Sequence, residues 1–399
     1  MLKKILLSVL IFGSLFGMGQ NTSCQWPFQN PISTGVPFLM IGPEARGGGY
    51  GDAGVATTPD VFSMTWNPAK YAFAESEMGL GIAYTPWLKN LVNGINLEYL
   101  SFYYKPGNLS AIGASLRYFT MGEIQFTDEM GNPTVTAKPN EFAVDVTYAR
   151  KLHDNLSLAV AGRFIYSNLT QGYSTGTGGT SQAAIAGAAD VAVYWQDDVN
   201  WFNGMPAQFA WGINISNIGS KVSYSDFGLD KQFIPTNLKF GPRLTVEFDD
   251  YNKMSFFFDV NKLLVPTTPV YDSTYENIKC GKDPYVSVIQ GMIQSWYDAP
   301  GGLPEEIAEF NTSVGTEYWY DDLFALRAGM FLESKYKGAR KYATLGIGLR
   351  YNVFGLDFSY LIPFGQTSSQ DALANTLRFN LVFDFGKAVN NNNIKNDLN

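Results

Sequence analysis

Six residues of this sequence, Gly49 to Gly54 ("GYGDAG"), match the G-x-G-x-x-G spacing with which dinucleotide-binding proteins hold a pyrophosphate. An acidic residue, Glu75, follows them in the chain, as the fingerprint requires. The chemistry also needs a strand before the glycines and a helix after them, because amides at the helix N-terminus bind the phosphates. Here Pro43 interrupts the preceding segment and Pro59 the following one. We therefore predict no nucleotide site, and the glycines need another explanation.

Other reactive side chains are too isolated for catalysis. The single histidine, His153, lies in the turn sequence "KLHDN" and has no companion His or Cys at zinc-ligand spacing. Glu305 and Glu306 in "LPEEIAEF" fit the first turn of a helix, where the helix dipole stabilises acidic residues. We predict that the protein is not an enzyme and that it uses no metal and no cofactor.

The N-terminus and the composition indicate export and a membrane setting. Residues 1–20 combine Lys3 and Lys4 with a short apolar run, which is typical of a secretory signal peptide and too short for a membrane-spanning helix. Aromatic residues make up 15% of the chain and charged residues only 16%, with 40 glycines. The net charge is −8 and no polybasic patch is present, which argues against nucleic acid as a partner.

Hydrophobic and polar residues alternate along much of the chain, which is the pattern of strands with two different faces. In "LRFNLVFDF", Leu377 and Phe379 share one face, whereas Arg378 and Asn380 lie on the other. Most such segments have the length of a tilted strand that crosses a bilayer, about 9–11 residues or somewhat more. The predicted strands are 79–88, 95–105, 110–120, 141–151, 155–167, 184–197, 206–217, 235–248, 253–262, 312–320, 323–333, 341–351, 354–362 and 376–385.

Short and long connections alternate between these strands. Tight links such as "KPGN" and "HDN" alternate with long ones, and "QDDVNWFNG" is the longest of the short class. Outer-membrane barrels have tight periplasmic turns and long extracellular loops. We predict an all-β fold, a 14-stranded antiparallel transmembrane β-barrel in the bacterial outer membrane, with both termini periplasmic because the strand number is even. The long connections lie near 120–140, 168–183, 218–234, 263–311 and 363–375.

The polar strand faces carry charges of both signs. Each would cost several kcal/mol in hydrocarbon, so we expect these side chains to face the lumen and to pair there. They are Arg117, Arg163, Arg243, Arg327, Arg350 and Arg378, with Asp145, Asp190, Glu247, Asp259, Asp357 and Asp384.

Residues 21–78 precede the first strand, and we predict that they fold into the periplasmic half of the wide lumen as a compact hatch. Glycine permits positive φ and a close approach to the barrel wall, and Asp52 is expected to accept backbone N–H groups in a tight turn. Arg46 and the turn at Asn67 are expected to contact inward-facing acids. The predicted order is signal peptide 1–20, hatch 21–78, barrel 79–386 and periplasmic tail 387–399. The hatch residues are Arg46, Gly47, Gly48, Gly49, Gly51, Asp52, Gly54, Asn67 and Pro68.

This topology separates the two cysteines, Cys24 on the periplasmic side and Cys280 in an outer loop. Two cysteines do not make a disulfide framework, and we predict no bond between them. The sequence before Cys24 also lacks the pattern of a lipidation site.

The stretch "EARGGGYGDAGVATTPDVFSMTWNPAK" resembles the N-terminal signature of the PorV (LptO) family, outer-membrane barrels of the type IX secretion system. It departs from the family pattern at Gly47, where Ala is usual, and at Tyr50, where Met is usual. More distantly, the small-residue run and the Asn-Pro-Ala turn resemble the hatch of FadL fatty-acid transporters. In length, strand number and the ending "LRFNLVFDFG", the resemblance extends over the whole chain.

The resemblance implies a carrier of secreted proteins. PorV-type barrels bind the C-terminal signal domain of cargo that leaves the translocon barrel, SprA or Sov. They deliver it to a surface attachment complex that includes a PorU-type protein. These proteins and outer-membrane lipid are the implied partners. The alternative is a FadL-like transporter of hydrophobic small molecules, which needs a continuous apolar tunnel; the charged inward faces argue against one.

The long connection 263–311 contains a candidate contact surface for these partners. Ile289, Met292, Ile293 and Trp296 recur there at helical spacing. An apolar helical face in an extracellular loop suits partner docking, with Trp and Met as anchors. Equally, this helix could pack over the mouth of its own barrel, and the sequence does not decide between the two.

Overall fold

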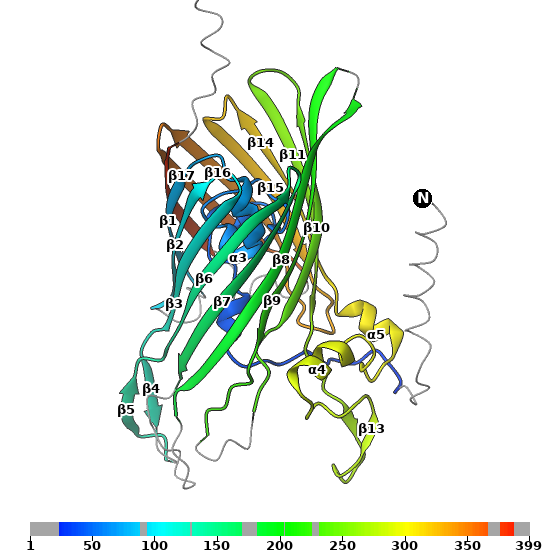
Figure 1. Cartoon of the computed structure of the whole chain (residues 1–399). Coiled ribbons are helices and arrows are strands. Elements are labelled where there is room, and N and C mark those ends of the chain that lie inside the picture. The colour runs from blue at the N-terminus through cyan, green and yellow to red at the C-terminus, as the bar shows by residue number, and fades with distance from the viewer. Residues whose placement is uncertain are drawn as a thin grey trace, which may run out of the picture.

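The computed structural model describes residues 24–87, 94–127, 130–169, 182–202, 204–225, 231–365 and 376–386. The predicted signal peptide (1–20) and tail (387–399) lie outside these residues. Within the described part, fourteen antiparallel strands form one closed barrel, as predicted (Figure 1). In chain order the barrel strands are β1 (Met78–Pro86), β2 (Ile95–Gly107), β3 (Ser110–Met121), β6 (Asn140–His153), β7 (Leu156–Asn168), β8 (Ala184–Phe202), β9 (Met205–Gly219), β10 (Asn237–Glu247), β11 (Asn252–Leu263), β14 (Asn311–Tyr320), β15 (Phe324–Leu332), β16 (Lys341–Tyr351), β17 (Phe354–Pro363) and β18 (Leu377–Phe385).

The first and last barrel strands close the wall. β1 pairs with β2 on one side and with β18 on the other, with Met78 opposite Phe385 and Tyr84 opposite Phe379. Closure removes the free edges of the sheet, and in a bilayer it also satisfies backbone groups that no water can reach.

The two faces of the strands differ as the alternating pattern predicts. On β18, Phe379 is 38% exposed on the outer surface, whereas Arg378 and Asn380 are buried on the inner side at 2% and 1%. Of the twelve charged residues predicted to point inward, Glu247 is exposed at the end of β10, but it shares the inward phase of Arg243 and lines the short-turn end of the bore. The wall therefore presents an apolar exterior and a charged interior.

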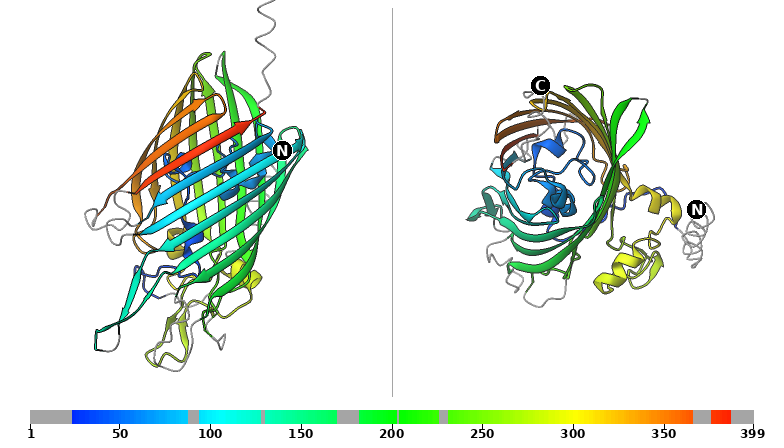
Figure 2. Two further views of the ribbon diagram at one scale, coloured as in Figure 1. Left: turned by 90° about the vertical axis from the view of Figure 1, so that its left-hand side faces the viewer. Right: turned by 45° about the horizontal axis from the view of Figure 1, so that its top comes forward.

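Tight turns lie at one end of the barrel and long loops at the other (Figures 1 and 2). β8 continues to Phe202 and β9 begins at Met205, so most of "QDDVNWFNG" belongs to paired strands and the link is tight. The long loops carry additional elements. These are the hairpins β4 (Ile124–Thr127) with β5 (Pro133–Ala137) and β12 (Val270–Tyr271) with β13 (Ile278–Cys280), and the helices α4 (Val288–Gln294) and α5 (Leu303–Ala308). Among the described helices, none has the length and apolar character needed to cross a membrane.

The segment before β1 runs through the bore from one end to the other. At the long-loop end, the amide of Gly35 donates to the carbonyl of Phe233. At the short-turn end, the amide of Glu77 donates to the carbonyl of Phe385. Between them lie four short helical elements inside the ring of strands (Figure 2, right). They are η1 (Pro37–Met40), α2 (Ala45–Gly48), α3 (Ser63–Trp66) and η2 (Pro68–Phe73).

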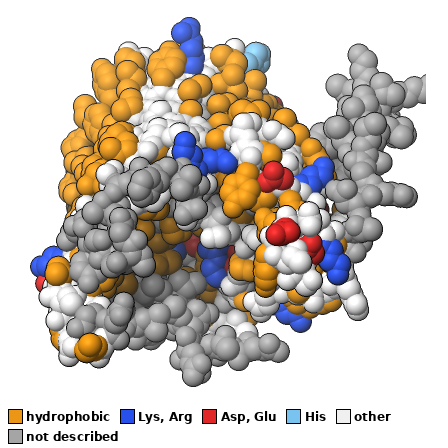
Figure 3. Space-filling model, turned by 90° about the horizontal axis from the view of Figure 1, so that it is seen from below, with side chains coloured by type: hydrophobic (Ala, Val, Ile, Leu, Met, Phe, Trp, Pro, Cys, Tyr) orange, Lys and Arg blue, Asp and Glu red, His pale blue; other side chains and the backbone are white. Residues whose placement is uncertain are grey.

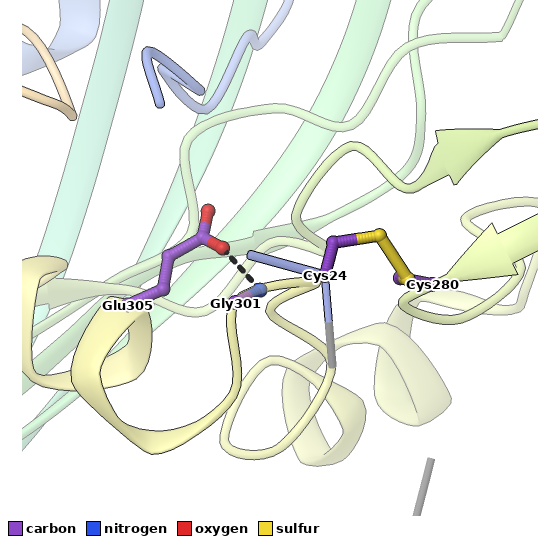
Figure 4. The surroundings of a disulfide bond; sticks show 4 residues. All are labelled: Cys24, Cys280, Gly301 and Glu305. Carbon is purple, nitrogen blue, oxygen red and sulfur yellow. Dashed lines mark hydrogen bonds between the residues drawn. A yellow bond between two sulfur atoms is a disulfide. The ribbon is translucent and has the colours of Figure 1, made fainter. Parts of the chain in front are cut away.

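The predicted separation of the two cysteines is wrong. Cys24 and Cys280 form a disulfide with a Cα–Cα distance of 5.8 Å, and the amide of Cys24 donates to the carbonyl of Pro300. Figure 4 shows the bond beside Gly301 and Glu305 of the long loop. The error came from counting strands alone, because the lumen segment adds one further crossing of the barrel. Cys24 and Phe385, near the two ends of the described chain, therefore lie at opposite ends of the barrel, not on one side.

The disulfide yields a direct test. The two cysteines are separated by 256 positions in the sequence, so in the heat-denatured wild-type protein the disulfide still closes a large covalent loop. On a non-reducing gel, this compact chain should migrate faster than the same sample treated with dithiothreitol. Cys24→Ser should abolish the difference. Equal mobility of the wild-type protein with and without reductant would contradict the disulfide.

Candidate functional site

The lumen segment is held to the barrel wall by buried ion pairs. Arg46 of α2 donates from Nη2 to Glu317 Oε1 at 3.0 Å, and from Nη1 to Asp60 Oδ2 at 2.8 Å. Glu317 in turn accepts from Arg327 Nε at 2.7 Å. Arg327 and Arg350 both pair with Asp357 at 2.8 Å. The signs alternate from the segment into the wall, so each charge lies beside an opposite one. Removing one member of such a buried pair typically costs about 3–5 kcal/mol.

A buried carboxylate organises the first turn of the segment. Glu44 caps α2 by accepting from the amides of Arg46 and Gly47, both at 2.6 Å. It also accepts from Trp66 Nε1 at 2.8 Å and from Asn380 Nδ2 at 3.0 Å. One side chain thus joins α2, α3 and the barrel wall.

The glycines of the signature allow the segment to approach the wall closely. A Cβ on Gly49 would lie 3.2 Å from both Arg327 Cβ and Gly346 Cα. A Cβ on Gly51, which has φ +78°, would lie 2.6 Å from the backbone of Met330. Glycine is required at these positions because a larger residue would not fit against the wall. This packing explains the glycines, which do not bind a phosphate. Three further glycines are confined by side chains. Gly47 lies against Glu44 and Trp66, and Gly54 lies against Trp66. Gly48 lies against Arg378.

Asp52 has a different role from the one predicted. Its carboxylate accepts from Arg378 Nη1 and from Tyr342 Oη, both at 2.5 Å, and thus binds the wall through side chains. The backbone N–H groups of the turn donate instead to Asp259 on β11, from Gly54 at 2.6 Å and from Val55 at 3.0 Å. An inward-facing acid of the wall therefore performs the turn-capping role that sequence assigned to Asp52.

The turn at Asn67-Pro68 also differs in its partners. Asn67 caps η2 by accepting from the amide of Ala69 at 3.0 Å. Its Nδ2 donates to the carbonyls of Val55 and Val193, both at 2.9 Å, and not to acids of the wall. Pro68 begins η2, where its fixed φ suits the first helical position.

Glu317, Glu44 and Trp66 are the main residues that the sequence analysis missed. Glu317 lies in "TSVGTEYWY", where Ser313, Gly315 and Glu317 share the inward phase of β14. The alternation along this strand could therefore have identified Glu317 as an inward-facing residue. Trp66 lies within the signature stretch, but its contact with Glu44 depends on how α2 and α3 meet and has no sequence pattern of its own.

Two cavities flank the lumen segment. The larger, about 900 Å³, lies at the short-turn end and is lined by charged residues that include Arg46, Glu317 and Asp357. The smaller, about 100 Å³, lies toward the long loops and has Arg117 and Lys239 in its lining. Among the described residues, no group of three or more His, Cys, Asp or Glu side chains could hold a metal ion.

The predicted loop helix is short and lies beside the barrel mouth. α4 and α5 project laterally beyond the wall (Figure 1; Figure 2, right). Ile289 and Ile293 are 60% and 59% exposed. Trp296, in contrast, is half-buried, with its ring 6.2 Å from that of Phe310, and Met292 is also half-buried. The four predicted contact residues therefore form two pairs. The outward pair is Ile289 and Ile293, and the inward pair is Met292 and Trp296. Figure 3 shows this end of the molecule, where hydrophobic and charged side chains adjoin on the loop.

A buried charged cluster fixes the loop to the barrel and to the N-terminal segment. Lys262 pairs with Glu309 at 2.5 Å, and Lys337 pairs with Glu305 at 2.6 Å and with Glu309 at 2.9 Å. Asn30 donates to Glu305 at 2.9 Å, which adds the N-terminal segment to the cluster. Burial, together with the nearby charges of two glutamates, raises the pKa of Asp298 to about 8.

Together these features define a class of protein. A closed antiparallel barrel with an apolar exterior, a charged interior and a filled bore fits an integral outer-membrane protein. The chain belongs to the PorV family, because the family model "Type IX secretion system protein PorV" matches residues 26–270. Membership identifies it as an outer-membrane component of a protein-secretion system.

The comparison with solved structures finds chains that are only distantly similar in sequence. The toluene transporter TodX of Pseudomonas putida shares 11% identity, with 89% of this chain and 98% of that chain covered and a TM-score of 0.46. For the toluene transporter TbuX of Ralstonia pickettii, the identity is 13%, the coverage 86% and 98%, and the TM-score 0.45. A Pseudomonas aeruginosa FadL homologue has 13% identity, coverage of 90% and 100%, and a TM-score of 0.41. Among curated protein sequences, none matches this chain.

Gly51 provides a test of the close packing between the lumen segment and the wall. Gly51→Ala forces a Cβ against the Met330 backbone at a positive φ, so we expect a loss of about 1–3 kcal/mol in stability. The measurement is the thermal unfolding midpoint of the detergent-solubilised protein. Gly162→Ala is the matched control, because a Cβ on this strand glycine meets nothing within 4 Å. Equal midpoints for the two variants would contradict the packing.

Proposed function

We propose that this protein carries secreted cargo at the cell surface and uses its exterior and loops rather than its bore. It binds the C-terminal signal domain of cargo that leaves the translocon barrel and passes that cargo to the surface attachment complex. The long-loop end faces outward and the short-turn end faces the periplasm. Family membership supports the secretion role. The proposal that cargo is bound from outside is supported by one observation, an exposed apolar surface beside a filled bore.

The bore is poorly suited to the passage of a polypeptide. Residues between Val36 and Ser76 occupy it, and the Arg46–Glu317 and Asp52–Arg378 pairs hold them to the wall. The disulfide at Cys24 fastens one end of the segment and β1 continues from the other. We infer that the segment acts as a permanent plug, so cargo must be bound from outside.

The outward pair on α4 is the proposed contact. Ile289 and Ile293 lie one helical turn apart and share a face, and both side chains are largely exposed. Exposed aliphatic side chains on a laterally projecting loop suit a protein partner. Trp296 is a less suitable anchor than the sequence indicated, because it already packs against Phe310 and Lys262 within the loop.

The alternative function, transport of hydrophobic small molecules, requires an apolar route through the bore. Both cavities that flank the lumen segment have charged residues in their linings, including Arg46 and Asp357 in one and Arg117 and Lys239 in the other. An uptake assay with a labelled fatty acid distinguishes the two functions. Saturable uptake that depends on this protein would favour the transporter.

The proposed contact surface can be tested by mutation. We expect Ile289→Ser combined with Ile293→Ser to reduce co-purification of cargo or translocon at least fivefold. The fold should survive because these side chains are largely solvent-exposed. The readout is pull-down from native membranes, with the heat-modifiable gel mobility of the barrel as the folding check.

The matched control is Leu109→Ser combined with Leu152→Ser. These residues are comparably exposed, at 55% and 59%, but belong to the short-turn end. Equal yields from both double variants would remove α4 from the contact surface.

A further inference from the structure

The buried cluster beneath the outer loop holds more negative than positive charge. Glu305 and Glu306 lie in the first turn of α5, as the sequence predicts, but both are buried there, at 0% and 6% exposure. Four carboxylates and two ammonium groups meet in this cluster, and each of the six residues is less than a tenth exposed. The residues are Asp298, Glu305, Glu306, Glu309, Lys262 and Lys337.

The two ammonium groups are shared among three glutamates. Lys262 pairs with Glu309 at 2.5 Å and with Glu306 at 3.2 Å. Lys337 pairs with Glu305 at 2.6 Å and with the same Glu309 at 2.9 Å. Two positive charges therefore face three negative ones, before the fourth carboxylate of the cluster is counted.

The fourth carboxylate, Asp298, pairs with neither lysine of the cluster. Its Oδ2 accepts from the amide of Thr267 at 3.2 Å, whereas its buried Oδ1 has no hydrogen-bond partner. The side chain is 1% exposed. The repulsion that it feels from Glu306 and Glu309 exceeds the attraction of Lys262. An ionised carboxylate in this place lacks both water and a counter-charge, so the neutral, protonated form is favoured.

The other cations of the neighbouring connections are engaged or solvated. The ammonium group of Lys282 lies over the ring of Tyr297, 3.7 Å from its centroid. Lys335 is exposed to solvent. Arg340 pairs with Glu333 at 2.7 Å. A bound proton is the simplest means of reducing the negative charge that remains in the cluster.

We propose that a proton-dependent latch holds the outer loop on the barrel, in which Asp298 must be protonated for the segment 298–309 to stay docked. When the proton passes to solvent, the negative charge left on Asp298 lies beside Glu306 and Glu309 in a buried site, where like charges repel strongly. The segment relieves this repulsion by moving away from the two lysines and into water. Because α4 belongs to the same loop, the protonation of Asp298 regulates how that helix is held beside the barrel mouth.

The direction of the pH effect follows from the pKa of Asp298. Burial, with the charges of Glu306 and Glu309, raises this pKa to about 8 in the docked loop, whereas a solvated aspartate has a pKa of about 4. The docked loop therefore binds the proton more tightly than the released loop does. Docking is strongest below about pH 4, and it weakens about tenfold per pH unit from there to about pH 8. Burial and the charge of Glu309 also raise the pKa of Glu306, which acts in the same direction.

Hydrogen exchange in the oxidised full-length protein in detergent tests the latch. The amides of Ala299 and Gly301 donate to Glu306 at 2.9 Å and to Glu305 at 2.6 Å, so their protection from exchange reports docking (Figure 4). Exchange is measured at about pH 5.5 and about pH 8 with EDTA present, and each rate is divided by the intrinsic rate at that pH. We expect protection in the wild-type protein to fall about a hundredfold between the two conditions. This readout does not depend on whether α4 binds cargo.

Two variants make the result specific. Asp298→Asn is neutral at both pH values and keeps an acceptor for the amide of Thr267, so its protection should change less than about tenfold. Asp283→Asn is the matched control, because Asp283 is an exposed acid of the same loop, and it should behave as the wild type does. Wild-type protection that does not change with pH, or an equal fall in Asp298→Asn, would overturn the proposal.

Discussion

The contact on which the rest of this structure depends is the buried ion pair between Arg46 and Glu317. A barrel of fourteen strands is wide enough to leave a lumen that must be filled or hydrated. The inner wall carries charges whose burial is costly unless each meets an opposite one. Arg46 supplies a cation from the lumen segment at the point where Glu317 joins Arg327 and Asp357. The segment is therefore part of the electrostatic balance of the wall, and the wall in turn positions the segment.

This interdependence explains why the signature is rich in glycine. An ion pair at 3.0 Å requires α2 to lie directly against the strands, and a side chain at Gly49 or Gly51 would hold it away. Glycines in the wall, Gly329 and Gly346, provide the matching space on the other side of the contact. The resemblance of "GYGDAG" to a nucleotide fingerprint therefore has a simple physical origin. Both need a backbone that can approach a partner closely, a phosphate in one case and a barrel wall in the other.

The barrel itself could be predicted from sequence because its determinants are local. Alternation with period two is set by strand geometry, and the inward charges of β18 and β15 follow the same phase. Contacts between distant segments were not predictable in this way. Asp52 and Asp259 exchange the roles expected for a turn residue and a wall residue, since either carboxylate could accept the same amides. Trp296 and Ile293 have similar helical spacing, and only the packing of Phe310 separates the inward residue from the outward one.

The path of the N-terminal segment was the largest error, and its cause is topological. Strand counting gives the side on which β1 starts, but it carries no information on whether the preceding segment turns back or traverses the bore. The traverse brings Cys24 to Cys280 and Asn30 to Glu305, so the loop that presents α4 is anchored to the segment that fills the lumen. The outer loop and the lumen segment thus form one connected unit.

Electrical recording in planar lipid bilayers tests the filled bore most directly. The oxidised full-length protein, inserted as a folded barrel, should show no stepwise ion conductance, because residues 36–76 occupy the lumen and are fastened at both ends. Stable open-channel steps from the wild-type protein would show that the bore is open to ions. That result would contradict the view that the protein works from its outer surface.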